Sequence, residues 1–228
     1  MFMPIVQGGV TWSRIAIGAL ESTKGFDNGS GKTNFSGNFD GLAIGDASDD
    51  RIVVVGITGN HSGTGEPTSV TIGGVTATIA GSVQRTGEND SSIWYALVPT
   101  GTTADIDIIY TGTRQVVAIA VWSIYGASGA PDYTAGHEGN TTGDATVSLT
   151  IPANGFGCAA NSGGGPDPMS VTWAGLTGDG EVFARTNSNH DFSSDNFSTL
   201  QSSLTVSATG SANMTNCSLA TASWGPAE

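Results

Sequence analysis

The sequence predicts an all-β protein, a jelly-roll-like antiparallel β-sandwich with little helix. Short segments rich in β-branched and aromatic residues recur about ten residues apart, as is typical of sandwiches and barrels. The 34 glycines are scattered between these segments, where they favour turns. No long stretch combines the 3.6-residue period of a helix with capping residues. Only 12% of the 228 residues are charged, so the composition is that of a folded chain with enough length for a large core.

The clearest local signal is a β-hairpin around Gly73-Gly74. The segments Ser69–Ile72 and Val75–Ile79 flank these two glycines, which can adopt the positive φ angles of a type I′ turn. This register places Ile72 opposite Val75. It predicts one hydroxyl-bearing face and one apolar face, the latter made of Val70, Ile72, Val75, Ala77 and Ile79.

Three further segments are apolar on both faces, which is typical of central strands. They are Arg51–Thr58, Ile93–Val98 and Gln115–Tyr125. The β-branched content of the last segment favours a strand over a helix. Asp105–Tyr110 alternates instead, which predicts that Ile106, Ile108 and Tyr110 point inward.

The second half of the chain continues the same spacing. Its predicted strands are Thr146–Ile151, Gly155–Ala160, Ser170–Ala174, Ser203–Ala208 and Cys217–Ser223. We interpret Asn161–Pro168 (NSGGGPDP) as a long loop inside one domain. The expected organisation is therefore an N-terminal arm or first strand at residues 1–25 and a single sandwich domain at residues 26–228.

The net charge of −13 argues against binding to nucleic acid or to anionic membranes, both of which need clustered lysine and arginine. No signal peptide is evident, and the longest apolar run, Val116–Trp122, is too short to span a membrane. We therefore expect a protein made in a cytoplasm. Cys158 and Cys217 are expected to be buried reduced thiols, with a later disulfide left open.

Three segments resemble binding motifs and fail on spacing or context. Gly31-Lys32-Thr33 lacks the first glycine that a phosphate-binding loop requires, because Phe26 occupies that position and Gly25 lies one residue too early. Gly155–Ala160 matches a dinucleotide fingerprint but precedes NSGGGPDP, which cannot form the required helix. Asp46–Arg51 fails the EF-hand pattern, so a solvated acidic turn is preferred and a looser calcium site is left open. We predict no cofactor.

The sequence also lacks a catalytic or metal-binding signature. His61, His137 and His190 lie in polar segments without metal-ligand spacing, and no serine nucleophile motif is present. We predict no catalytic residue, no metal site and no enzymatic activity.

The tryptophans divide into two groups. Trp94 and Trp122 lie in predicted central strands and are expected in the core. Trp12 and Trp173 lie nearer strand ends, which makes them the candidate exposed aromatic contacts.

Two stretches carry a resemblance to a known class. SVTIGGVTATIAGS and SSIWYALVPTGTTADIDIIYTGTRQVVAIAVWSIYG resemble β-rich proteins encoded by tailed phages and prophages of bacteria. The segments IPANGFGCAA, VTWAGLTGD and ASW look like the second half of the same domain, so the likeness covers Arg51 to Trp224. It implies a particle protein of the capsid-decorating or tail-fibre type.

We therefore expect a non-enzymatic structural protein of a phage virion, made in the cytoplasm of the bacterial host. The leading hypothesis is a capsid decoration or cement protein that docks on the lattice of the major capsid protein through its N-terminal arm. The expected partners are the major capsid protein or other virion proteins, together with further copies of the chain. The alternative is a tail-associated receptor- or carbohydrate-binding sandwich. A hydrolase, which would need a pair of carboxylates facing each other in a cleft, is the third hypothesis.

Overall fold

The computed structural model describes residues 15–32, 35–62, 65–85, 89–139, 144–165, 169–185, 188–212 and 214–227. Within these ranges every regular element is a β-strand, and the all-β prediction is confirmed. No helix long and apolar enough to cross a membrane occurs in this part of the chain.

The strands divide into two sets along the chain. The first set is β1 (Ile17–Lys32), β2 (Ser36–Ala43), β3 (Ile52–Ser62), β4 (Ser69–Ile72), β5 (Val75–Thr76), β6 (Thr78–Gln84), β7 (Asn89–Leu97), β8 (Thr103–Ile109) and β9 (Thr113–Tyr125). The second set is β10 (Tyr133–Glu138), β11 (Ala145–Ile151), β12 (Gly155–Gly164), β13 (Val171–Ala174), β14 (Thr177–Arg185), β15 (Ser188–Phe197), β16 (Gln201–Gly210) and β17 (Thr215–Trp224).

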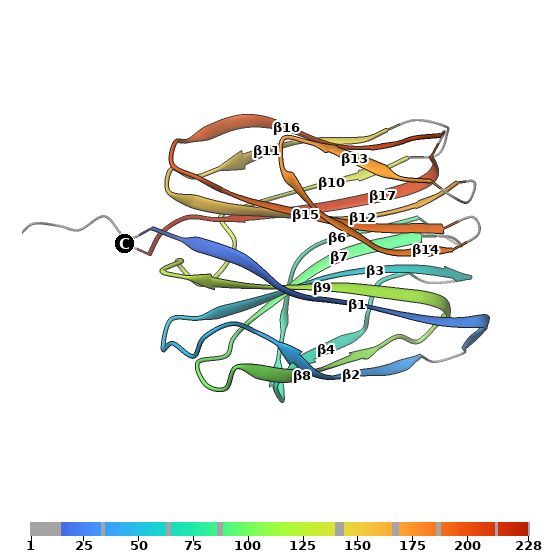
Figure 1. Ribbon diagram of the computed structural model, residues 1–228, viewed down its shortest axis with the longest axis horizontal. Coiled ribbons are helices and arrows are strands. Elements are labelled where there is room, and N and C mark those ends of the chain that lie inside the picture. Colours follow the sequence, from blue (N-terminus) through green and yellow to red (C-terminus); the bar gives the residue numbers. More distant parts are fainter. Residues whose placement is uncertain are drawn as a thin grey trace, which may run out of the picture.

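These strands form four sheets that are stacked in layers (Figure 1). The first outer sheet has the order β2-β8-β4-β5, and the first inner sheet has the order β1-β9-β3-β7-β6. The second inner sheet has the order β10-β17-β12-β15-β14, and the second outer sheet has the order β11-β16-β13. All pairings between strands are antiparallel.

The two halves of the chain have the same topology. Replacing β1, β9, β3, β7 and β6 by β10, β17, β12, β15 and β14 converts one inner sheet into the other, in identical order. Likewise, β2-β8-β4 becomes β11-β16-β13. In each half the first strand pairs with the last, the second with the next to last, and the third with the one before that, which is the nested pairing of a jelly roll.

The two jelly rolls meet through their inner sheets in a reciprocal manner. β6 lies against β10 and β17, and the equivalent strand β14 lies against β1 and β9. β3 lies against its own equivalent, β12. Such exchange of equivalent contacts is the mark of an isologous interface, so an approximate twofold axis relates the two halves.

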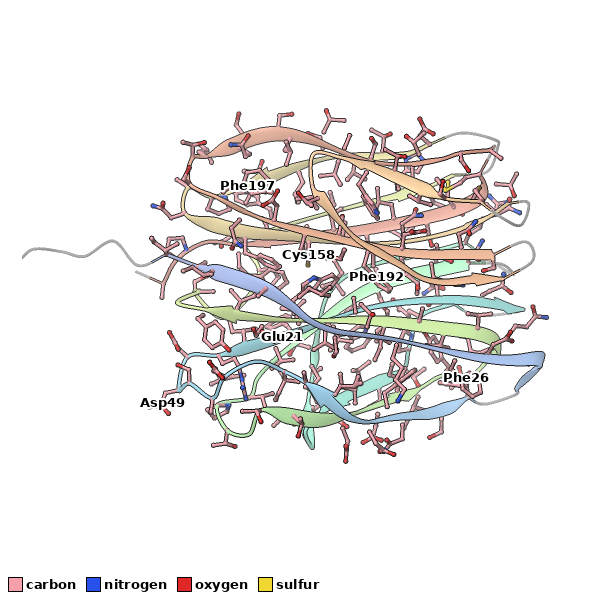
Figure 2. The ribbon with its side chains drawn as sticks, in the orientation of Figure 1. Glu21, Phe26, Asp49, Cys158, Phe192 and Phe197 are labelled. Carbon is pink, nitrogen blue, oxygen red and sulfur yellow. The ribbon has the colours of Figure 1, made fainter. Side chains whose placement is uncertain are left out.

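Three cores fill the spaces between the four sheets. β9 shows how the sequence builds two of them at once: Val117, Ile119 and Val121 point into the first core, and Ala118, Ala120 and Trp122 point into the middle one. A strand inside an inner sheet is buried on both faces, which explains the continuous apolar runs that predicted central strands. Figure 2 shows Cys158 and Phe192 between the two inner sheets.

The predicted hairpin is confirmed in its register and in part of its apolar face, where Val70, Ile72 and Ala77 are buried. Thr71 pairs with Thr76 and Ile72 with Val75, and both Gly73 and Gly74 have positive φ angles of 58° and 79°. The expected burial of Val75 and Ile79 is wrong, because their side chains are 40% and 38% exposed. β5 ends after two residues and the chain then crosses to the inner sheet as β6, so these two side chains lie at an open edge.

Two other expectations differ from the structure. Asn161–Gly164 belong to β12 and are fully buried, so the loop predicted at Asn161–Pro168 is wrong over its first half. Pairing with β15 and β17 on both sides holds these polar residues in a strand. The residues expected to form a single sandwich, 26–228, are distributed over two sandwiches, and β1 runs across the boundary expected between residues 25 and 26.

Candidate functional site

Part of the interface between the two inner sheets is polar, and its centre is the imidazole of His190 on β15. The Ser188 hydroxyl lies 2.8 Å from Nε2, and the hydroxyls of Thr58 and Ser162 lie 3.0 and 3.4 Å from Nδ1. All four residues are buried. Burial lowers the pKa of His190 to about 3, so the ring is neutral at physiological pH.

This serine–histidine contact does not resemble a hydrolase site. A catalytic histidine needs a pKa near the working pH and a carboxylate or carbonyl that orients it, together with access to substrate. Here hydroxyl groups surround a fully buried ring of low pKa. The arrangement acts as a structural hydrogen-bond network.

The network continues across the interface and joins the two jelly rolls. Asn89 Nδ2 donates to the carbonyl of Asn216 at 2.8 Å, and the hydroxyls of Ser91 and Ser218 lie 2.9 Å apart. Ser162 Oγ contacts Asn89 Oδ1 at 3.2 Å. Buried polar pairs of this kind favour one relative orientation, because a shifted interface would leave them unsatisfied.

A second polar cluster lies beside this interface, on the side of the first core. Asp90 is fully buried, and Tyr110 donates its hydroxyl to Asp90 Oδ2 at 3.3 Å. The Arg114 guanidinium stacks on the Tyr110 ring, with its central carbon 3.8 Å from the ring centroid. Burial raises the pKa of Asp90 to about 7, against the opposing effect of Arg114.

The structure places the residues that the sequence singled out as follows. Trp12 lies outside the described residues. Trp173 is half-buried against the third core, and its indole N–H is buried without a hydrogen-bond partner there. Trp94 and Trp122 are buried as predicted, and Cys158 and Cys217 are both buried and unbridged.

The three near-motifs lie in strands and turns. Gly155–Ala160 is an interior part of β12, which confirms the strand interpretation. Lys32 ends β1, and Thr33 lies outside the described residues. Asp46–Asp50 form the turn before β3, where Gly126 donates its amide to Asp50 Oδ2 at 3.0 Å. Among the described side chains, no group of three or more histidine, cysteine, aspartate or glutamate residues could hold a metal ion.

The two ends of the described chain meet at one end of the molecule (Figure 1). Ala227 donates its amide to the Gly126 carbonyl at 2.7 Å, and Ala16 donates its amide to the carbonyl of Asn154 at 2.9 Å. We call this region the terminal end. A cavity of about 260 Å³ opens there, lined by Ile15, Ala16, Asn154, Gly155, Asn196, Phe197 and Ser198. Phe197 is labelled in Figure 2.

Exposed aliphatic side chains occur at a cavity-lining residue and within two positions of lining residues in the sequence. Ile15 and Ile17 are 51% and 53% exposed, and Leu200, two residues after the cavity-lining Ser198, is 60% exposed. Clustered exposure of large apolar side chains is unfavourable in water and marks surfaces that contact a partner. The terminal end is therefore the candidate functional site.

Asn196 fixes the terminal end to the rest of the fold. Its side-chain amide donates to the Gly18 carbonyl and accepts from the Gly18 amide, both at 2.8 Å, which links β1 of the first jelly roll to β15 of the second. We expect Asn196→Ala to lower the free energy of unfolding by about 1–2 kcal/mol, because two backbone partners lose their hydrogen bonds. Asn196→Asp keeps the acceptor and removes the donor, and should cost less. Urea unfolding measures both; equal stability of all three chains would contradict the assignment.

Sequence reasoning did not find these groups. His190 lies in a segment that the sequence marks as polar, and Asp90 and Asn196 lie outside the predicted strands. Pairing along β7 and β15 makes all three strand residues. Ile15 and Ile17 could have been found, because the expected arm already included both residues.

The chain matches no family model, no curated protein and no solved structure. Its class is defined by its own architecture, as a tandem of two jelly rolls packed through their inner sheets.

Proposed function

We propose that the protein is a non-enzymatic structural protein of a tailed-phage particle, a capsid decoration or cement protein that docks on the major capsid protein through its terminal end. The observation that carries the proposal is the exposure of three aliphatic side chains at the terminal end: Ile15, which lines the cavity, and Ile17 and Leu200, which lie close to lining residues in the sequence. The resemblance of the strand-and-turn segments to phage particle proteins supports the proposal that the chain belongs to a tailed-phage particle.

The rest of the molecule fits such a role. Four stacked sheets with three filled cores make a stiff body, and the interface between the jelly rolls is fixed by hydrogen bonds. A stiff body that attaches by one end presents its remaining surface outward. That is the task of a protein that covers a capsid.

The alternative, a carbohydrate-binding tail module, needs exposed aromatic side chains on which sugar rings can stack. Among the described residues, Tyr133 is the aromatic side chain in the exposed class, at 48%. The exposed side chains therefore support docking through the terminal end more than sugar binding on an aromatic surface.

The test is incorporation of variants into particles produced by the bacterium that encodes the chain. Burial of a large aliphatic side chain contributes about 1.5–3 kcal/mol, so the double variant I15S/L200S should lower occupancy on purified heads by tenfold or more. The matched control is V75S/I109S, which changes two exposed aliphatic residues of the first outer sheet and should leave occupancy unchanged.

Mass spectrometry of separated heads and tails measures the occupancy. The proposal is wrong if the protein is absent from heads or is found at the tail tip. Equal incorporation of I15S/L200S and the unmodified chain would reject the terminal end as the docking surface.

A further inference from the structure

The edges of the two outer sheets differ in how they are protected. An edge strand carries unpaired backbone groups that can pair with another chain, and natural proteins blunt such edges. β5 has two residues and β13 has four. β2 is irregular between Phe39 and Leu42, and Asp105 Oδ1 accepts the Gly41 amide at 2.8 Å. Within the part of the chain that the structure describes, these three edges are poor templates for pairing.

β11 is the fourth edge and lacks these protections. Its seven residues, Ala-Thr-Val-Ser-Leu-Thr-Ile, include no glycine, proline or charged side chain. Its register with β16 is regular from Ala145 to Leu149. Among the described strands, β16 is the sole pairing partner of β11. No described strand is hydrogen-bonded to the opposite backbone edge of residues 145–149, although β10 of the inner sheet packs close to β11.

The strands of this sheet are also free of charge, and the exposed Asp144 lies just before β11. β11, β13 and β16 contain no acidic or basic residue, although the chain carries a net charge of −13. The outward positions of β11 are Thr146, Ser148 and Thr150. By contrast, the equivalent outer sheet of the first jelly roll carries Asp40, Asp105 and Asp107. Two copies of this acidic chain therefore repel each other least at the second outer sheet.

We propose that β11 pairs with β11 of a second copy of this chain, in antiparallel orientation, so that the two second outer sheets join into one continuous sheet. A twofold axis through Val147 places Thr146 opposite Ser148 of the second copy and Ala145 opposite its Leu149. The buried positions 145, 147 and 149 then continue the core face, and the hydroxyls continue the outer face. An isologous contact of this kind closes as a dimer.

The occupant is a second copy because the strand is complementary to itself. Apolar side chains alternate with hydroxyl-bearing side chains on both sides of Val147. β11 itself has no charged side chain that would need an opposite charge on a different partner. The proposal goes beyond the assignment to a phage particle and does not depend on it. Its test uses the purified full chain in solution, so a failure leaves the docking of the terminal end unaffected.

The test is the molar mass in solution by sedimentation equilibrium over a wide range of protein concentration. The unmodified chain is expected to approach twice its 23.0 kDa mass. T146E/S148E places like charges opposite each other in both cross-strand pairs and should raise the dimer dissociation constant about tenfold. T146E/S148K places opposite charges there and should restore the dimer.

A control separates edge pairing from packing of one face on another. T172E/A174E adds the same two charges, at the same two-residue spacing, to the exposed positions of β13, the opposite edge of the same sheet. Edge pairing predicts an unchanged dimer, whereas face packing predicts its loss. A monomeric unmodified chain, a dimer insensitive to T146E/S148E, or a dimer lost in T172E/A174E would each overturn the proposal. Circular dichroism confirms that each variant remains folded.

Discussion

Arg51→Met is expected to lower the free energy of unfolding by about 3–5 kcal/mol, a large part of the stability of a typical domain. Arg51 is completely buried. Its guanidinium donates five hydrogen bonds of 2.6–2.8 Å, all to main-chain carbonyls: two to Val98 and one each to Gly45, Thr100 and Gly101. Methionine has a similar length and no donor, so it leaves these four buried or half-buried carbonyls without their partner.

These carbonyls belong to two connections that meet at the start of β3. Gly45 lies between β2 and β3, and the other three residues lie between β7 and β8. Arg51 therefore holds the first outer sheet to the first inner sheet. A lysine retains the charge but has fewer donors in the wrong geometry, so Arg51→Lys should lose part of this stability.

Urea unfolding followed by tryptophan fluorescence measures the effect as a shift in midpoint at constant slope. The control is Arg85→Met, because Arg85 is half-buried and its guanidinium donates to the Gly139 carbonyl at 2.8 Å. We expect that control to change stability by about 1 kcal/mol or less. Similar losses in the two variants would show that Arg51 has no special role.

Arg51 also shows where prediction from the sequence ends. The apolar run after it predicts a central strand, and β3 confirms this because its side chains alternate between two cores. A single arginine before such a run carries no signal of burial. Its role depends on carbonyls about 50 residues away in the chain, and only the folded structure brings them together.

Strands with a strong pattern were predicted, and polar strands were not. The alternation in β8 and the glycine turn at Gly73-Gly74 follow from local chemistry, and the structure has both. β15 reads Ser-Asn-His-Asp-Phe-Ser-Ser-Asp-Asn-Phe and has no hydrophobic period, yet its first six residues are buried. Pairing with β12 and β14, and packing against the first jelly roll, determine that strand.

The repeated strand order of the two halves was not predicted, for a similar reason. Ser-Val-Thr occurs at Ser69 in β4 and at Ser170 just before the equivalent strand β13, but most other equivalent positions differ. A jelly roll constrains which positions are buried and places few limits on which residue is buried there. The tandem is therefore visible in the strand order and not in the sequence.

The difference in charge between the two outer sheets bears on the proposed dimer. The two outer sheets occupy equivalent positions, but one carries aspartates and the other carries hydroxyls alone. Two identical outer faces would give a molecule that either repels itself on both sides or associates on both sides without limit. One acidic face and one neutral edge allow a closed dimer and leave the acidic face exposed.

The second large effect is a loss of stability with rising pH that depends on Asp90. Burial raises the pKa of Asp90 in the folded protein to about 7, above its ordinary value of 3.8. Between these two values the folded state binds a proton that the unfolded state has released. The contribution of protonated Asp90 to the free energy of unfolding is therefore fully present below about pH 4. It is lost as the pH rises to about 7, by up to about 1.4 kcal/mol per pH unit.

The charged and titratable groups around Asp90 agree with this sign. Arg114 and the Tyr110 hydroxyl favour the ionised form, Glu66 opposes it, and desolvation exceeds them all. Asp90→Asn imitates the neutral acid at every pH, so it should match the unmodified chain near pH 4 and below, and exceed it in stability at pH 8. Urea unfolding at both pH values measures the difference in stability between the two chains, which cancels the titration of other groups.

The control is Asp105→Asn, on the exposed outer face, which should leave the pH dependence of stability in place. If Asp90→Asn loses stability equally at pH 4 and pH 8, the carboxylate is ionised throughout and is held by Arg114 rather than neutralised by burial.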